Sequence, residues 1–301
     1  MKCRFPTSEV AIHNIHCIVA FFPPRRSPSV LSFTMTVYTE PQYVQDGVAH
    51  FPRLSAMGVG NAFSWGAAAK NMTFSFGDKV AAKIANNKFF TTCGFGRYKD
   101  AVVLHSENSD RLLHLSAEEI AALKPTAYGR FARCDALFTS ARDQVLAVKP
   151  ADCTVATIYV EKSVGSPAMI GLVHAGWRGA DKRLPFHAAK YLIDTLKIDP
   201  ARIHIGLTPA LRKGIKRFQH ADEFHDKEAW GVYMTQHEND FTIDESGYVL
   251  SQYLEAGVPE ANIEVYRMDT YAAHARGESF SELYSRDTGA TQGRFLVTVR
   301  M

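Results

Sequence analysis

Two short stretches of the chain combine residue types that bind metals or act as nucleophiles. Cys153 lies in the segment PADCT, and His174 ends the apolar run GLVHA just before the turn Gly-Trp-Arg-Gly. Thiolate and imidazole groups suit zinc or copper, and the same pair serves as nucleophile and base in cysteine hydrolases. No local spacing rule joins the two residues. They form a site if neighbouring strands bring them together.

A third stretch, LHSEN around His105, offers another imidazole. A catalytic zinc usually takes three protein ligands and leaves one position for water or substrate. Structural explanations stand beside this one, because a lone cysteine in an apolar strand often behaves as a small buried hydrophobe. Trp177 is equally compatible with a core position, and Arg178 with a surface ion pair. Residue types alone therefore indicate a candidate site and no particular reaction.

The elements around these residues are those of an α/β protein. Short apolar or alternating runs predict strands, and amphipathic runs that stop at Gly or Pro predict helices. The predicted helices are 80–96, 186–198 and 246–258. The predicted strands are 100–106, 111–116, 135–140, 144–160, 168–176, the start of 201–211, 263–274 and 293–301. No internal repeat and no long linker interrupts them, so we expect one α/β domain with a mixed sheet.

The first 34 residues differ from the rest of the chain. They include FPPRRSP and show no clear period, and proline prevents a helix and weakens a sheet. We expect residues 1–34 to be a disordered extension or to reflect a gene start placed too far upstream. The folded catalytic domain is then 35–301.

Composition narrows the class of partner and the compartment. The chain has 301 residues, 46% hydrophobic and 22% charged, with a net charge of +3, which gives no reason to expect nucleic acid or an anionic membrane as partner. No apolar stretch reaches the length of roughly 18 residues that a membrane span needs. Five scattered cysteines without a CxxC pair favour a reducing compartment, so we expect a cytoplasmic protein.

Four segments carry a resemblance to a known family. The ADC of PADCT followed by HAGWRG resembles the signature pair of the laccase-domain family, whose members are also called multicopper polyphenol oxidase-like or peptidoglycan-editing-factor proteins. The preceding run from CDALFTS, the segment GDKVAAKIANNKFF and the closing YSRDTGATQGRFLVTVRM resemble further segments of that family. The resemblance runs from about residue 55 to the C-terminus, with departures around IGLTPALRKG and MDTY that mark a divergent member.

The resemblance implies a layered α/β/β/α fold and one metal site. Its ligands fall on His105, Cys153 and His174, with His114 as the competitor of His105 for the first position. The expected metal is zinc, and copper is the alternative because thiolate and imidazole accept both. Arg286 matches the arginine on the phosphate side of the site. Arg178 is the second phosphate candidate, or else it ties loop carbonyls together.

The implied activity is a zinc-dependent purine nucleoside phosphorylase that acts on adenosine, inosine or methylthioadenosine, with adenosine deamination as a second activity. Its partners would be a purine nucleoside and phosphate. A copper polyphenol oxidase is the alternative that the family name suggests, although the chain has no His-x-His pair of the kind that multicopper sites use. Two further hypotheses stay open: a cysteine hydrolase or amidase of peptidoglycan-editing type that uses Cys153 and His174, and a degenerate nucleoside-binding protein.

Overall fold

The structure is a computed structural model that describes residues 35–45, 47–220 and 223–301. The expectation for residues 1–34 lies outside the described residues, and those from 35 onward belong to one compact unit. Among the described helices, none is both long and apolar enough to cross a membrane.

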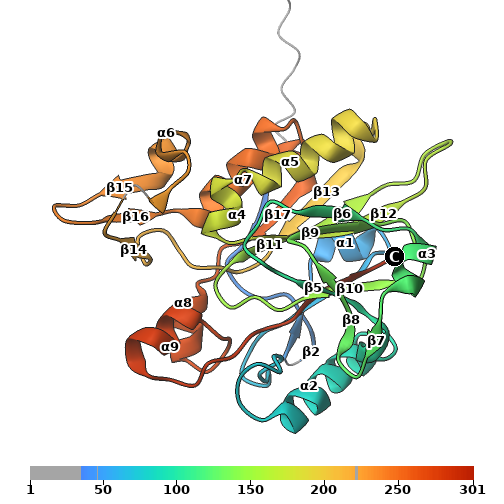
Figure 1. Cartoon of the computed structure of the whole chain (residues 1–301), viewed down its shortest axis with the longest axis horizontal. Coiled ribbons are helices and arrows are strands. Elements are labelled where there is room, and N and C mark those ends of the chain that lie inside the picture. Colours follow the sequence, from blue (N-terminus) through green and yellow to red (C-terminus); the bar gives the residue numbers. More distant parts are fainter. Residues whose placement is uncertain (1–34, 46, 221–222) are drawn as a thin grey trace, which may run out of the picture. The chain divides into compact units, whose positions relative to one another are not determined.

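Two mixed sheets form the centre of the fold (Figure 1). The first sheet has the order β1-β17-β13-β11-β12-β9-β6, with strands Thr36–Tyr38, Ile263–Tyr266, Ile203–Leu207, Thr154–Val160, Met169–Ala175, Ala136–Thr139 and Leu112–His114. The second sheet has the order β2-β3-β4-β18-β10-β5-β8-β7, with strands Tyr43–Gln45, Val48–Ala49, Gly60–Ser64, Val297–Arg300, Val145–Val148, Val102–His105, Gly129–Arg133 and Pro125–Thr126. Parallel and antiparallel neighbours occur in both sheets.

The two sheets pack face to face, and helices cover their outer faces. One apolar cluster joins Leu172 of the first sheet to Leu146 and Val299 of the second. A second cluster joins the outer face of the first sheet to α5 and α7, and a third joins the outer face of the second sheet to α2. Figure 1 shows α5 and α7 on one side and α2 on the opposite side. This arrangement confirms the predicted α/β/β/α layers.

The helices begin where the sequence supplies caps. Asp78 accepts hydrogen bonds from two backbone amides at the start of α2, and Ser116 forms a capping box with Glu119 at the start of α3. The predicted helix 186–198 is α5 followed by one π-helical turn. The nine helices of the described residues are Pro52–Ala56 (α1), Lys79–Thr92 (α2), Ala117–Ala122 (α3), Trp177–Asp181 (α4), Leu184–Lys190 (α5), Lys227–Trp230 (α6), Glu245–Glu255 (α7), Thr270–Ala275 (α8) and Glu282–Thr288 (α9).

Two predicted strands differ from the structure. The segment 144–160 is not one strand, because β10 of the second sheet ends at Val148 and β11 of the first sheet begins at Thr154. The segment 263–274 was expected to be a strand throughout, but β17 ends at Tyr266 and α8 follows. The reason is the Asp269 carboxylate, which accepts a hydrogen bond from the Tyr271 amide and caps the helix. This change of direction carries the chain away from the sheet and towards the candidate site.

A small third sheet was absent from the sequence prediction. Its order is β14-β16-β15, with strands Arg217–Phe218, Phe241–Ile243 and Met234–Gln236. Each strand is three residues or shorter, which is below the length at which an alternating pattern can be read. Phe218 and Phe241 stack with their ring centroids 5.5 Å apart, and Phe218 also lies 5.1 Å from Trp177, so the small sheet is held against α4.

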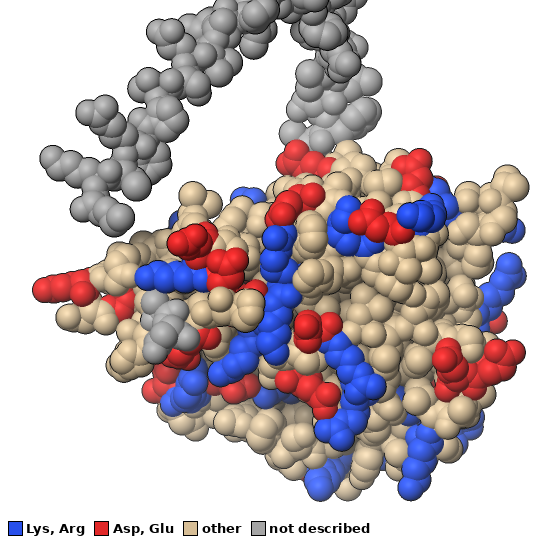
Figure 2. Space-filling view, turned by 45° about the horizontal axis from the view of Figure 1, so that its top comes forward, with Lys and Arg blue, Asp and Glu red and all other residues tan. Residues whose placement is uncertain are grey.

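Acidic and basic side chains are interspersed over the face drawn in Figure 2. The basic residues form a central band that acidic residues flank on both sides. Basic and acidic side chains are therefore close neighbours on this face.

Candidate active site

The register of the first sheet brings Cys153 and His174 together. Strands β11 and β12 are antiparallel neighbours, with Thr154 opposite Ala175 and Val155 opposite His174. Cys153 immediately precedes β11 and therefore lies beside the end of β12. Both residues line one cavity, and Cys153 lies close enough to His174 to act on the pKa of its ring. The pair that the sequence analysis singled out is assembled by the two central strands.

Asp135 is a third member of this group, and the sequence analysis did not identify it. Its Oδ1 lies 3.0 Å from His174 Nδ1, and its backbone carbonyl accepts a hydrogen bond from the His174 amide. The carboxylate is fully buried and also accepts hydrogen bonds from the hydroxyl and amide of Ser109. The signal in the sequence was a carboxylate at the start of an apolar strand, where burial without a partner is costly.

The electrostatics of the group favour a protonated His174. Burial of the ring lowers its pKa, but the neighbouring Cys153 and Asp135 outweigh burial and raise the pKa of His174 to about 10. Burial likewise acts to raise the pKa of Asp135, yet the hydrogen bonds from His174 and Ser109 outweigh it and lower that pKa. His174 therefore carries a proton at neutral pH, and Asp135 carries the compensating charge.

Gly176 is required by the closeness of Cys153. A methyl group at position 176 would lie 2.6 Å from Cys153 Sγ, which is too short for a real contact. Gly176 therefore avoids Cβ crowding beside the site. Gly179 has no such need, because a methyl group there would meet its nearest neighbours at an ordinary 3.6 Å.

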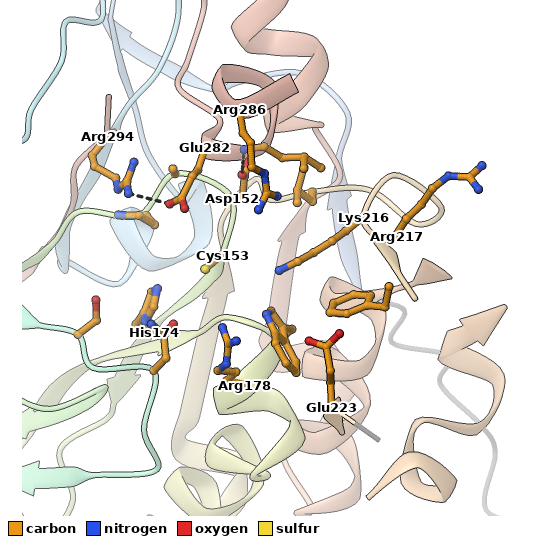
Figure 3. A pocket seen from close by; sticks show the side chains of 18 of the residues that line it. Asp152, Cys153, His174, Arg178, Lys216, Arg217, Glu223, Glu282, Arg286 and Arg294 are labelled. Carbon is orange, nitrogen blue, oxygen red and sulfur yellow. Dashed lines mark hydrogen bonds and ion pairs between the residues drawn. The ribbon is translucent and has the colours of Figure 1, made fainter. Parts of the chain in front are cut away.

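A cavity of about 700 Å³ opens in front of Cys153 and His174. Six cationic side chains line it: Lys149, Arg178, Lys216, Arg217, Arg286 and Arg294. Figure 3 shows Arg178, Lys216 and Arg286 reaching from three sides toward the space before Cys153. Within the described residues these three make no ion pair, whereas Arg217 pairs with Asp240 and Arg294 with Glu282. Four acidic residues also line the cavity: Asp152, Glu223, Asp240 and Glu282. The positive charge next to the Cys-His pair therefore comes from Arg178, Lys216 and Arg286.

Arg178 is held by an aromatic ring. Its guanidinium carbon lies 4.2 Å from the centroid of the Trp177 ring, and Trp177 is itself packed against Phe218 and Phe224. The alternative that Arg178 ties loop carbonyls together finds no such hydrogen bond among the described residues. A stacked guanidinium keeps its donors free for a ligand.

Arg286 reaches the cavity because Asp152 anchors its helix. Asp152 Oδ2 accepts a hydrogen bond from the Leu283 amide in the first turn of α9, and Oδ1 accepts one from the Thr270 hydroxyl at the start of α8. Asp152 directly precedes Cys153. The ADC segment therefore positions both the thiol and the helix that carries Arg286.

The structure does not bring His105 to the other two predicted ligands. His105 ends β5 in the second sheet, where its ring lies 6.2 Å from that of Phe131, and it lines a second cavity rather than the one in front of Cys153. Its competitor His114 ends β6 of the first sheet, where its Nδ1 makes a 2.9 Å hydrogen bond with the Tyr191 hydroxyl. Among the described residues, neither histidine forms a group with Cys153 and His174 that could hold a metal ion.

This geometry decides how well a metal fits. Outside the undescribed positions 1–34, 46 and 221–222, no three His, Cys, Asp or Glu side chains are arranged to hold a metal ion. Cys153 and His174 supply two donors, and the Asp135 carboxylate orients the histidine as carboxylates do behind metal-bound imidazoles. Two protein donors do not complete the three-ligand zinc site that the resemblance implied.

A comparison with protein families finds one match, and it covers most of the chain. Residues 57–301 match the family described as multi-copper polyphenol oxidoreductase laccase. The chain belongs to this laccase family. No curated protein sequence matches the chain significantly.

Solved structures share the laccase-family fold of this chain. The Bacillus licheniformis hypothetical protein YfiH has a TM-score of 0.73 and 17% identity, covering 88% of this chain and all of its own. YlmD from Geobacillus stearothermophilus has a TM-score of 0.70 and 20% identity, covering 87% of this chain and 99% of its own. Neisseria meningitidis protein NMB0706 has a TM-score of 0.61 and 18% identity, covering 81% of this chain and 94% of its own. At these identities the likeness concerns the fold.

Proposed function

We propose that this laccase-family protein is a purine nucleoside phosphorylase whose substrates are adenosine, inosine or methylthioadenosine, together with phosphate. The observation that carries the proposal is the convergence of Arg178, Lys216 and Arg286 on the cavity in front of Cys153 and His174. A phosphate dianion needs several cationic donors to replace its hydration, and guanidinium groups match its geometry.

In phosphorolysis a phosphate oxygen forms a bond to C1′ of the ribose while the bond from C1′ to the purine nitrogen breaks. The electron pair of that bond leaves with the purine, which takes up a proton, and the products are ribose 1-phosphate and the free base. The three cations hold the phosphate and orient its oxygen toward C1′. His174, kept protonated by Asp135 and Cys153, contributes a fixed positive charge at the floor of the cavity.

The resemblance attaches zinc, or alternatively copper, to this reaction. Since the described residues supply two donors, we derive no step from a metal. Metal content is instead measured beside activity.

The first test is phosphate-dependent turnover of adenosine, inosine and methylthioadenosine, with products separated by chromatography. We expect free base and ribose 1-phosphate in equal amounts, formed in proportion to the phosphate supplied. Inosine formed from adenosine without phosphate would reveal deamination as a second activity. Absence of ribose 1-phosphate with all three nucleosides, in protein whose metal content is known before and after chelation, would contradict the proposal.

The Asp135–His174–Cys153 sequence of contacts favours a second candidate, a cysteine hydrolase or amidase. A nucleophile, a base and an orienting carboxylate joined in this order are the arrangement of cysteine hydrolases. In such an enzyme Cys153 would attack a carbonyl carbon and His174 would transfer the proton to the leaving amine.

Alkylation separates the two candidates. A nucleophilic Cys153 should react rapidly with iodoacetamide after chelation, and the reaction should abolish cleavage of amide substrates such as peptidoglycan fragments. If alkylated protein lost amidase activity but never formed ribose 1-phosphate, the hydrolase assignment would replace the phosphorylase.

A further inference from the structure

A second cavity of about 380 Å³ adjoins the one in front of Cys153. The two cavities share three lining residues: Ser106, Lys149 and Arg294. A ligand that occupies the first cavity can therefore extend into the second without crossing the protein interior.

Aromatic side chains dominate the wall of this second cavity. They are Phe74, Phe76, Tyr98, Tyr128, Phe131 and His105. The Phe74 and Tyr128 ring centroids lie 4.4 Å apart, and the Phe131 ring remains 39% exposed with the His105 ring against it. Tyr98 is buried, whereas Phe74, Phe76 and Tyr128 are partly exposed. Partly exposed aromatic rings gathered on a concave surface are typical of a ligand site.

Lys149 stands at the boundary between the two cavities. Its Nζ lies 3.9 Å from the Phe74 ring centroid and 4.5 Å from that of Tyr98. Burial lowers the pKa of Lys149 to about 7, so a neutral amine is accessible near neutral pH. An amine in this position can share a proton with a ring nitrogen, whereas a permanently charged guanidinium cannot.

We propose that this aromatic cavity is the compartment that binds the planar purine base, with Lys149 as the polar contact at its entrance. The proposal rests on the proposed function, since the ribose would then span the shared wall while phosphate stays among Arg178, Lys216 and Arg286. A purine has two flat faces and ring nitrogens at its edge. Stacking on the exposed Phe131 and one contact from Lys149 satisfy both features.

Calorimetric titration of the full-length protein with hypoxanthine, and separately with inorganic phosphate, tests the compartment. Phe131→Leu removes the exposed ring and keeps an apolar side chain, so we expect the Kd of hypoxanthine to rise about tenfold while the Kd of phosphate stays unchanged. Tyr43→Leu is the matched control, because Tyr43 is also an exposed aromatic residue on a strand but lies outside both cavities.

Two further variants keep the result interpretable. Lys149→Met should weaken hypoxanthine binding, and exposed His105→Ala should weaken it while leaving the metal content of the protein unchanged. Equal hypoxanthine affinity in the wild type and Phe131→Leu, or no binding to the wild type at all, would overturn the base compartment.

The outcomes for the compartment and for the phosphorylase are separable. If nucleosides are phosphorolysed but Phe131→Leu and Lys149→Met leave the nucleoside KM unchanged, the compartment is wrong and the phosphorylase stands. If hypoxanthine binds in a Phe131-dependent way but no ribose 1-phosphate forms, the compartment stands as a purine site and the phosphorylase is wrong.

Discussion

Asp135 shows that the chemistry of the site depends on a residue outside the recognised motifs. Its buried carboxylate forms a hydrogen bond with the His174 ring. It also accepts hydrogen bonds from the backbone amides of the three consecutive residues 107–109. The charge is therefore fixed in position before any ligand arrives. A histidine held in this way keeps one ring orientation and one protonation state.

Asp135→Asn should remove the negative charge beside His174 while preserving the shape of the side chain. The amide removes the negative charge that holds the proton on His174, so we expect activity to fall by at least about tenfold. Ser109→Ala, which removes one donor but keeps the carboxylate, should have a smaller effect. Turnover and far-ultraviolet circular dichroism measured together check the prediction, and equal activity of Asp135→Asn and wild type would contradict it.

The cations of the cavity allow a second prediction at this scale. Arg286→Ala should raise the KM for phosphate by about 10- to 100-fold, because a charge-assisted hydrogen bond is lost, and should change the nucleoside KM much less. Arg217→Ala is the control, since Arg217 pairs with Asp240 and points away from the cavity in Figure 3. Equal effects of Arg286→Ala on both KM values would show that Arg286 has a structural role.

At the scale of elements, the turn from β12 into α4 is the most constrained part of the site. Gly176 is the N-cap residue of α4 with an ordinary φ of −68°, so the need for glycine is the contact with Cys153 rather than backbone conformation. Gly179 lies inside α4 with room for a methyl group. The two glycines of one motif therefore differ in what they tolerate.

Gly176→Ala should destabilise the protein by about 1–3 kcal/mol, because the methyl group displaces Cys153 or the turn, and should lower activity. Gly179→Ala should be neutral or stabilising by up to about 1 kcal/mol, since glycine inside a helix is unfavourable relative to alanine. Denaturant unfolding of both variants checks the pair. Similar loss of stability in both would refute the steric explanation.

Sequence reasoning was most successful for the central strands and least successful for the elements around the cavity. The strands that contain Val155 and His174 are long, apolar and almost wholly buried. An apolar run of this length predicts a buried strand from the local sequence alone. The segment after Tyr266 was misassigned because the cap formed by Asp269 outweighed an alternating pattern. His105 lies in β5 of the second sheet, and which sheet a strand joins is decided by pairing between distant segments, which no local pattern records.

At the scale of the whole molecule, one buried carboxyl group links the helical layer that contains α7 to the first sheet. Glu245 begins α7, is 4% exposed, and its Oε1 accepts a hydrogen bond from the Thr154 amide at the start of β11. Burial raises its pKa to about 7, with Lys216 and the Thr154 hydrogen bond opposing that shift. Folding therefore favours the protonated form of this group.

Glu245 should make the folded protein less stable as pH rises. The Glu245 carboxyl ionises near its ordinary pKa of 4.5 in the unfolded chain and near 7 in the folded protein. The protonated carboxyl therefore contributes its full share to the free energy of unfolding below pH 4.5, and this contribution is lost between pH 4.5 and 7. Glu245→Gln should raise the free energy of unfolding by up to about 3 kcal/mol at pH 8 relative to the wild type, with the difference shrinking toward pH 5. Urea unfolding at several pH values checks this, and a difference independent of pH would contradict it.

The antiparallel register that opposes Val155 to His174 gives the site two parts with different freedom to change. Its floor is made of central strands, so Cys153 and His174 separate only if the middle of the first sheet opens. Its rim is made of α9, which Asp152 anchors, and the short strand β14, which packs on Trp177; neither belongs to the first sheet. Substitutions at the rim can thus alter which ligand enters while the floor persists, and the specificity of this scaffold can diverge without disturbing its chemistry.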